Sequence, residues 1–340
     1  MSYVQPLLFS GIEAKESAPV VPRESSSTFV NNMVLPVHRW FRYSAGFSAA
    51  WVESVLREEQ QKGPVRVFDP FAGSATTLIA AECVGVESMG IDPHPFVARI
   101  ARAKLLWRTD PGLYVKKIEA LKQAAARLVP DLDGYPPLIR TCYDDDALST
   151  LDQYRRAYEA MRDDTPESAM VWLTLVAILR KVSKAGTAQW QYVLPKKQKR
   201  SPLSPERALD EQCLMMVEDM RVGRAITGPR AKFIESDART CEGVPTNFAN
   251  LVITSPPYPN NYDYADATRL EMSFMREING WGCLQRKVRR HLIRSCSQHV
   301  PEKSVNLRAV LASPELEPIR AELTEVCERL SQIRQTKGGK

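Results

Sequence analysis

The chain has 340 residues, of which 44% are hydrophobic and 25% are charged, and its formal net charge is +6. This composition is typical of a soluble globular protein that can bury a sizeable core. No run approaches the roughly 20 apolar residues of a membrane span and no secretory signal begins the chain, so we expect a cytoplasmic protein that is not in a membrane.

Cysteine and histidine usage argues against disulfides and metal sites. The seven cysteines are scattered and never form a C-x-x-C pair, so we expect reduced thiols. The four histidines do not cluster, so we expect no metal. The mild positive charge permits a polyanionic partner without requiring one.

The first elements predicted in chain order alternate between strands and helices. Residues 1–30 are polar and rich in Pro and Ser, which is typical of a flexible arm. An aromatic segment and a helix then lead to a buried strand at Val65–Asp69. A glycine turn, a helix, the strand ESMGI and another helix follow. This βαβ order predicts a parallel sheet with a right-handed crossover.

A long helical stretch then interrupts the sheet. From about Pro111 to Met220 the periodicity is helical, no convincing strand occurs, and Pro195–Pro202 reads as a basic loop. Strand patterns return in AKFIESD and LVITS, and the chain from Asp263 onward again looks helical. We therefore predict an α/β protein with a Rossmann-like sheet, a large all-helical insertion and a helical C-terminal segment.

The turn DPFAGSATT and Asp92 favour a nucleoside site at the end of the first two strands. A glycine between a strand and a helix lets a ligand approach the backbone, although an ordinary tight turn is the alternative. The turn lacks G-x-G-x-x-G and G-K-[ST], so neither a dinucleotide nor ATP is favoured. Asp92 follows about 20 residues later, where a carboxylate can accept hydrogen bonds from ribose hydroxyls. Alternatively, Asp92 caps the helix that follows Pro93.

Two further polar sites follow strands of the same predicted sheet. Asp237, after FIES, could accept a hydrogen bond from an adenine amine, or it could be an ordinary turn residue. The strand LVIT ends in Ser255-Pro256-Pro257-Tyr258. The two prolines lack N–H donors, so this stretch can offer a rigid set of acceptors and one aromatic face to an amino group. A polyproline turn with a packing tyrosine is the alternative.

Together these motifs resemble the amino-methyltransferases of DNA, in which S-adenosylmethionine binds a doubly wound sheet and [SND]-P-P-[YFW] holds the target amine. The resemblance covers roughly residues 37–261. DPFAGSATT is similar to the cofactor loop D-P-F-x-G-S-G-T-T, with Ala75 at the second glycine, and HRWFRYSAGF is similar to the segment that closes over the methionine end. The resemblance implies catalytic roles for Ser255, Pro256, Pro257 and Tyr258, and cofactor contacts from Asp69, Pro70, Phe71, Gly73, Ser74, Thr76, Asp92 and Asp237.

The implied function is methyl transfer from S-adenosylmethionine to a flipped base of double-stranded DNA. S-P-P-Y is the variant usually associated with the N4 amine of cytosine, and adenine N6 is the alternative. No Pro-Cys dipeptide occurs, which argues against a carbon-5 cytosine enzyme. Two rival classes remain: a methyltransferase acting on RNA or on a protein glutamine, and a binding module that does not turn over alone.

The resemblance also divides the chain and suggests partners. Strands that should complete the sheet are not evident after Tyr264, so candidate partners are a second chain that completes the domain and a cognate restriction endonuclease.

A second basic run, Arg286 to Arg294, is more readily explained as a solvated helix face. The expected phosphate contacts are Lys196, Lys197, Lys199 and Arg200. The expected units are a flexible arm (1–30), the cofactor-binding half (31–108), a helical insertion that recognises the target (109–228), the rest of the catalytic core (229–265) and a helical C-terminal segment (266–340).

Overall fold

The computed structural model describes residues 29–43, 46–188, 191–199, 201–258, 262–293, 295 and 306–337. Almost all of the predicted N-terminal arm, together with Arg200 and Arg294, lies outside these ranges. No helix within them is long and apolar enough to traverse a lipid bilayer.

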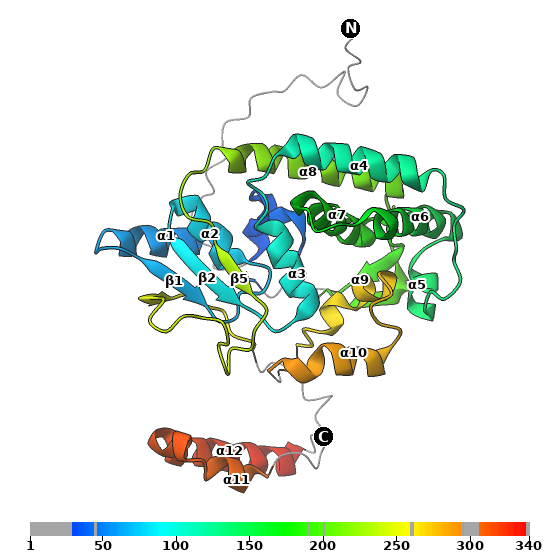
Figure 1. The fold of residues 1–340 in the computed structure, drawn as a ribbon. Coiled ribbons are helices and arrows are strands. Elements are labelled where there is room, and N and C mark those ends of the chain that lie inside the picture. Colours follow the sequence, from blue (N-terminus) through cyan, green and yellow to red (C-terminus); the bar gives the residue numbers. More distant parts are fainter. Residues whose placement is uncertain are drawn as a thin grey trace.

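A four-stranded parallel sheet forms one half of the molecule (Figure 1). Its order is β5-β2-β1-β6, so the carboxyl ends of all four strands meet at one edge. The predicted strands are confirmed, although the one expected over LVITS is only two residues long. The strands are β1 (Arg66–Asp69), β2 (Glu87–Ile91), β5 (Lys232–Ile234) and β6 (Leu251–Val252).

Three helices connect these strands to the rest of the chain. Helices α1 (Ala49–Gln60) and α2 (Thr76–Val84) pack together, and their apolar side chains form a small core with Val67 of β1. Helix α3 (Pro95–Lys104) contacts β5 on one side and the helical half of the molecule on the other. The βαβ unit predicted from the sequence is therefore present.

The other half is built around one buried helix, α7 (Pro166–Val182). Its sequence MVWLTLVAIL is apolar around the whole circumference, so it is stable only where other helices cover every side. The covering helices include α4 (Pro111–Ala125), α6 (Asp145–Met161) and α8 (Pro205–Arg224), with α3 at one end. A short helix that we did not predict, α5 (Pro137–Cys142), lies beside them.

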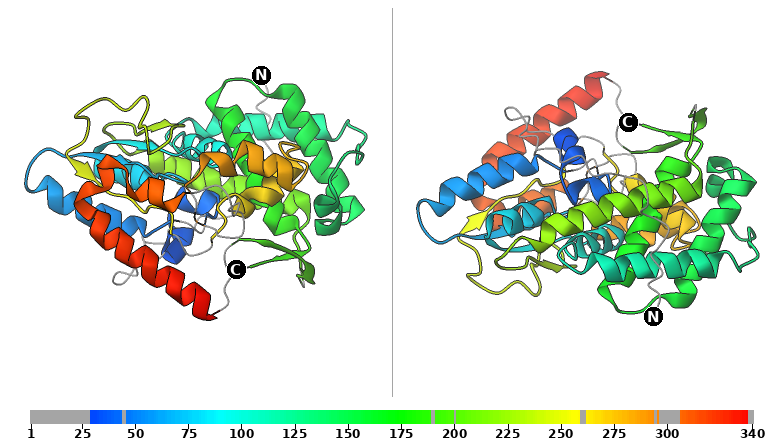
Figure 2. Two further views of the ribbon diagram at one scale, coloured as in Figure 1. Left: turned by 90° about the horizontal axis from the view of Figure 1, so that it is seen from below. Right: turned by 90° about the horizontal axis from the view of Figure 1, so that it is seen from above.

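The prediction of an all-helical insertion is wrong at one place. An antiparallel hairpin of β3 (Ala185–Thr187) and β4 (Val193–Gln198) follows α7, at the periphery of the helical half (Figure 2). Half of the stretch expected to be a loop, Pro195 to Gln198, is therefore strand. Both strands of a two-stranded hairpin are edges, so a proline is tolerated there and the usual strand pattern is weak.

The predicted C-terminal segment does not form one unit. Helices α9 (Arg269–Phe274) and α10 (Trp281–Lys287) belong to the helical half: Arg180 of α7 donates to Glu271 of α9 at 3.0 Å. By contrast, α11 (Leu307–Leu311) and α12 (Arg320–Lys337) stand apart from the rest (Figure 1).

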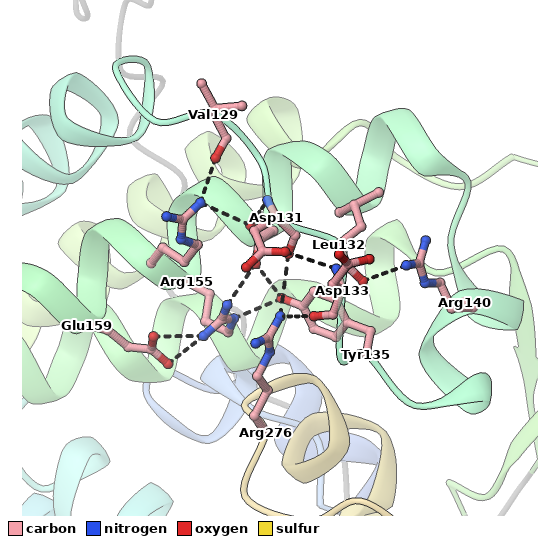
Figure 3. A network of polar contacts seen from close by, with 11 residues as sticks. Val129, Asp131, Leu132, Asp133, Tyr135, Arg140, Arg155, Glu159 and Arg276 are labelled. Carbon is pink, nitrogen blue, oxygen red and sulfur yellow. Dashed lines mark hydrogen bonds and ion pairs between the residues drawn. The ribbon is translucent and has the colours of Figure 1, made fainter.

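A polar network with a buried centre, Asp152, Tyr135 and Arg155, fixes the loop between α4 and α5 (Figure 3). The Asp152 carboxylate accepts from the Asp131 N–H at 2.8 Å, the Tyr135 hydroxyl at 2.9 Å and Arg155 at 2.7 Å. Arg276, just after α9, donates to the Asp133 carbonyl at 2.7 Å, with its guanidinium 4.6 Å from the centre of the Tyr135 ring. The network thus joins the insertion to the chain that follows the S-P-P-Y motif.

One carboxylate on α8 holds the aromatic segment that precedes the sheet. The side chain of Asp219 is 2% exposed and accepts from the Val37 N–H at 2.8 Å, the Trp40 indole at 2.8 Å and the Arg39 guanidinium at 2.6 Å. A fully desolvated carboxylate needs such donors. The contact fixes residues 37–43, including Tyr43, against the helical half.

Asp219→Ala should lower the free energy of unfolding by about 3 to 5 kcal/mol, because it leaves a partly buried guanidinium and two donors without an acceptor. Glu218 is the matched control: its side chain is 55% exposed and lies 3.7 Å from the same guanidinium. Glu218→Ala should cost less than about 1 kcal/mol. Urea unfolding measures both, and equal losses would contradict the assignment.

Candidate active site

A pocket lies at the carboxyl ends of the four parallel strands. The space between its lining atoms is about 560 Å³, a volume that includes open solvent. Six of the predicted site residues line it: Phe71, Gly73, Asp92, Asp237, Ser255 and Pro257. The remaining walls come from Tyr43, which lies in the HRWFRYSAGF segment, and from residues that we did not single out: Pro93, His94, Ala238, Tyr264, Leu292 and Ile293.

The loop after β1 forms the floor of the pocket. Its Ala72 N–H donates to the Ile91 carbonyl at 3.0 Å, which holds the loop against the end of β2. A Cβ on Gly90 would lie only 2.7 Å from the Ala72 Cβ, so this approach requires glycine in β2. Gly73 has φ 50°, and a Cβ there would lie 3.4 Å from the Tyr43 ring. Ala75, at the second glycine of the family loop, has the left-handed φ of 73° and precedes α2.

Asp69 lies beneath the pocket rather than in its lining. Its carboxylate is 1% exposed and accepts from the Phe71 N–H at 3.0 Å, the Thr77 hydroxyl at 2.6 Å and the Thr254 hydroxyl at 2.8 Å. Burial raises the pKa of Asp69 to about 6. Pro70, Ser74 and Thr76 also do not line the pocket. Asp69 supports the loop that forms the pocket floor through its hydrogen bond with the Phe71 N–H.

Asp92 joins the loop to the start of α3. One oxygen accepts from the Gly73 N–H at 3.1 Å and the other from the His94 N–H at 2.9 Å. The residue that caps α3 is His94, and Pro95 rather than Pro93 occupies the first turn, so the alternative of Asp92 as helix cap is wrong. Burial raises the pKa of Asp92 to about 6. A carboxylate has about four acceptor sites, so Asp92 retains capacity toward the pocket.

Asp237 lines the opposite side of the pocket and is paired with Arg239. The Arg239 guanidinium donates to both carboxylate oxygens, at 2.9 Å from Nε, and the Arg239 N–H donates to Oδ1 at 2.9 Å. These hydrogen bonds lower the pKa of Asp237 below its usual value. Asp237 is therefore an ionised acceptor that would share its oxygens with any ligand.

The S-P-P-Y stretch runs from the pocket to the surface. Ser255 and Pro257 line the pocket, whereas the Tyr258 side chain is 59% exposed and does not. The Tyr258 N–H donates to the Tyr264 hydroxyl at 3.2 Å, so Tyr264 fastens the end of the motif. Tyr264 stands only six positions after Tyr258 in the same polar-aromatic run, and that run was the available signal for it.

The chain after the motif returns to the pocket through an ion pair. The Arg289 guanidinium donates to the Asp263 carboxylate, at 3.2 Å from Nε, and lies 5.0 Å from the centre of the Trp281 ring. This pair places Leu292 and Ile293 in the pocket wall. Arg289 is therefore not part of a solvated helix face, and no sequence pattern connects residues 292 and 293 to the distant motifs.

The predicted phosphate contacts have different environments. Lys196 and Lys197 are exposed on β4, as a contact to DNA requires. Lys199 is half-buried, donates to the Arg180 carbonyl, and has a pKa lowered by burial. Arg200 lies outside the described residues.

A parallel sheet with a glycine turn and an acidic side chain at the carboxyl ends of neighbouring strands is the arrangement of a Rossmann-like α/β fold. Comparison with curated proteins then finds type II methyltransferases. The chain is 24% identical to M.BsoBI of Geobacillus stearothermophilus over 323 residues, which are 84% of this chain and 61% of that protein. It is 24% identical to M.AvaI of Nostoc sp. over 281 residues, 73% of this chain and 56% of that protein. The homologues of this chain are thus type II methyltransferases, which confirms the resemblance inferred from the motifs.

A shorter match is stronger in identity. Over 69 residues the chain is 39% identical to the type II methyltransferase M.MjaII of Methanocaldococcus jannaschii. These residues are 20% of this chain and 13% of that protein. The chain spans about three-fifths of the length of the first relatives, 61% and 56%. No protein-family profile matches the sequence. No solved structure matches the chain.

The raised pKa of Asp69 predicts a pH-dependent stability. The carboxyl is protonated more readily in the folded than in the unfolded chain, so its contribution is most favourable below the unfolded pKa of 3.8 and is lost as pH rises through about 6. Asp69→Asn stays neutral, so its stability relative to the wild type should rise by roughly 2 to 3 kcal/mol between about pH 4 and pH 8.

Urea unfolding of both proteins across this pH range measures the difference. Asp164→Asn, which alters an exposed carboxyl in a loop, is the control and should leave the difference from the wild type nearly constant. A constant difference for Asp69→Asn as well would contradict the raised pKa.

Proposed function

We propose that this chain is a site-specific DNA methyltransferase that moves a methyl group from S-adenosylmethionine to the exocyclic amine of a flipped base. The first proposed target is the N4 amine of cytosine. The observation that carries the proposal is the convergence of Gly73, Asp92, Asp237 and Ser255 on one pocket, although they lie far apart in the sequence. The similarity to type II methyltransferases supports the same reaction class.

The pocket suits the nucleoside part of S-adenosylmethionine. Asp92 would accept hydrogen bonds from the ribose hydroxyls, and Asp237 one from the adenine amine. Phe71, Leu292 and Ile293 supply apolar walls for a flat ring. The close approach of Gly73 to Tyr43 leaves a narrow cradle that a larger side chain would fill. The bound cofactor would supply an electrophilic methyl group on a sulfonium.

The S-P-P-Y stretch would hold the target amine. The Ser255 hydroxyl and the Pro256 carbonyl are acceptors, and an amine that donates to both would keep its lone pair directed away from them. Positioning of this kind supplies much of the catalysis in reactions without a covalent enzyme intermediate. A base inside a duplex cannot reach the pocket, so it must be flipped out, and the exposed Tyr258 ring would stack on it.

DNA binding would involve the helical half. Lys196 and Lys197 on the exposed hairpin would contact phosphates, whereas Lys199 would not, because its ammonium is engaged with a carbonyl. We place the protein in the cytoplasm, with a cognate restriction endonuclease as a partner. Adenine N6 is the alternative target.

A second candidate is a methyltransferase whose sheet is completed by a further polypeptide segment, such as a second chain. Among the described residues β6 is an edge strand of only two residues, and its Val252 is 57% exposed. An exposed apolar edge can pair with another strand. In this case the chain alone would bind S-adenosylmethionine, and transfer would require the second polypeptide.

The direct test incubates the full chain with labelled S-adenosylmethionine and unmethylated genomic DNA, with RNA as competitor. Mass spectrometry of the digested nucleosides then distinguishes N4-methylcytosine from N6-methyladenine. Methylcytosine supports the first proposal and methyladenine the alternative. Cofactor binding without transfer, rescued by the product of the neighbouring reading frame, supports the second candidate, and transfer to RNA alone would overturn all three.

Two substitutions should separate the two parts of the site. Ser255→Ala should lower kcat by about 100-fold, because an acceptor for the amine is lost, while the cofactor Kd changes less than about threefold. Asp92→Ala should instead raise the cofactor Kd by about tenfold or more. Calorimetry and methyl-transfer rates measure both. Ser54→Ala on the exposed face of α1 is the control, and weaker cofactor binding by Ser255→Ala would contradict the assignment.

A further inference from the structure

The hairpin that the sequence did not predict contacts the chain that follows the S-P-P-Y motif. Tyr192, at the tip between β3 and β4, accepts a hydrogen bond from the Asp263 N–H at 2.6 Å. Its ring stacks on that of Tyr262, with the centres 5.8 Å apart and the planes at 22°. The tip is therefore bound by both a polar and an aromatic contact.

The contacts continue from there to the motif itself. The ring of Tyr262 meets Tyr264 edge to face, with the centres 4.4 Å apart and the planes at 90°. The Tyr264 hydroxyl then accepts the Tyr258 N–H at 3.2 Å, and Tyr264 also lines the pocket. We call Tyr192, Tyr262 and Tyr264 the tyrosine link, because they join the hairpin tip to the last residue of the motif.

The last contact of the link acts on a backbone that has few other donors. Pro256 and Pro257 lack an N–H, so the Tyr258 N–H is the first backbone donor after Ser255. A hydrogen bond to this group therefore controls the direction in which the acceptors of the motif point. Only the hydroxyl of Tyr264 makes this contact within the described part of the chain.

Hydrogen bonds hold the tip of the hairpin in place, whereas the far part of β4 is exposed to solvent. Arg180 of α7 donates to the Gln191 carbonyl at 2.6 Å, and the Gln191 side chain donates to the Arg42 carbonyl at 2.6 Å. Lys196 and Lys197 are exposed farther along β4. DNA bound to these lysines would affect the position of the tip, because the hairpin is one unit that α7 holds through Arg180.

We propose that the β3–β4 hairpin is a DNA-contacting arm that aligns the S-P-P-Y loop for the target base through the tyrosine link. This inference rests on the proposed function and adds to it a partner contact and two positioning residues, Tyr192 and Tyr264. The lysines meet the phosphate backbone, and the hydroxyls of the two tyrosines fix the loop that receives the base. The arm thereby makes the alignment of the motif depend on bound DNA.

The test compares tyrosine-to-phenylalanine variants, which keep the rings and remove one hydroxyl each. Tyr192→Phe and Tyr264→Phe should each lower kcat by threefold to tenfold, as expected for one lost hydrogen bond, with the cofactor Kd and the KM for DNA changed less than about twofold. Tyr158→Phe is the matched control: its buried hydroxyl accepts from Arg99 at 2.9 Å away from the loop, and kcat should stay at the wild-type value.

Two combinations complete the experiment. The double variant Tyr192→Phe/Tyr264→Phe should have a kcat only slightly lower than that of the less active single variant, because both tyrosines act on one loop. Lys196→Ala/Lys197→Ala should raise the KM for DNA and reduce its salt dependence.

The outcomes separate the inference from the proposed function. Wild-type protein that binds S-adenosylmethionine but methylates no DNA, even with the product of the neighbouring reading frame added, overturns the proposed function and the inference together. Active wild type with Tyr192→Phe indistinguishable from Tyr158→Phe, or with additive losses in the double variant, overturns the inference alone. A loss caused by weaker cofactor binding would also overturn it, since the link would then support the pocket rather than the loop.

Discussion

The buried carboxylate of Asp69 is the contact on which the geometry of the site depends. It stands at the end of β1 and binds three different elements: the loop that follows it, the first turn of α2 through Thr77, and the chain after β6 through Thr254. Because one carboxylate contacts all three, the loop after β1 and the S-P-P-Y stretch have a fixed position relative to each other. Burial raises the pKa of this group, so keeping the carboxylate ionised in this position costs free energy.

The helical half acts as a frame for the same site. Asp219 of α8 holds the aromatic segment that brings Tyr43 to the pocket, and Arg180 of α7 ties the hairpin tip to Glu271 of α9. The sheet supplies the floor and the acidic groups, whereas the helices determine where the walls stand. The described residues of the insertion do not line the pocket, but they hold chain segments that do.

Much of the fold could be predicted because its signals are local. The strand ESMGI was predicted with its observed bounds, and α7 was evident from a continuous apolar run. The hairpin was missed because β3 has three residues and β4 contains Pro195 and two lysines, so neither shows a strand pattern. Its stability comes from contacts at its tip with residues far away in the chain, such as Asp263.

The sequence by itself determined the order of elements and the chemistry at the strand ends, because glycine turns, acidic residues and the S-P-P-Y stretch are encoded within a few positions. It also indicated which residues are candidates for the site. Only the tertiary structure decided that Asp69 lies beneath the pocket while Asp92 faces it, and that Leu292 and Ile293 form a wall. The physical reason is that burial and contact depend on the packing of distant segments, which no local pattern specifies.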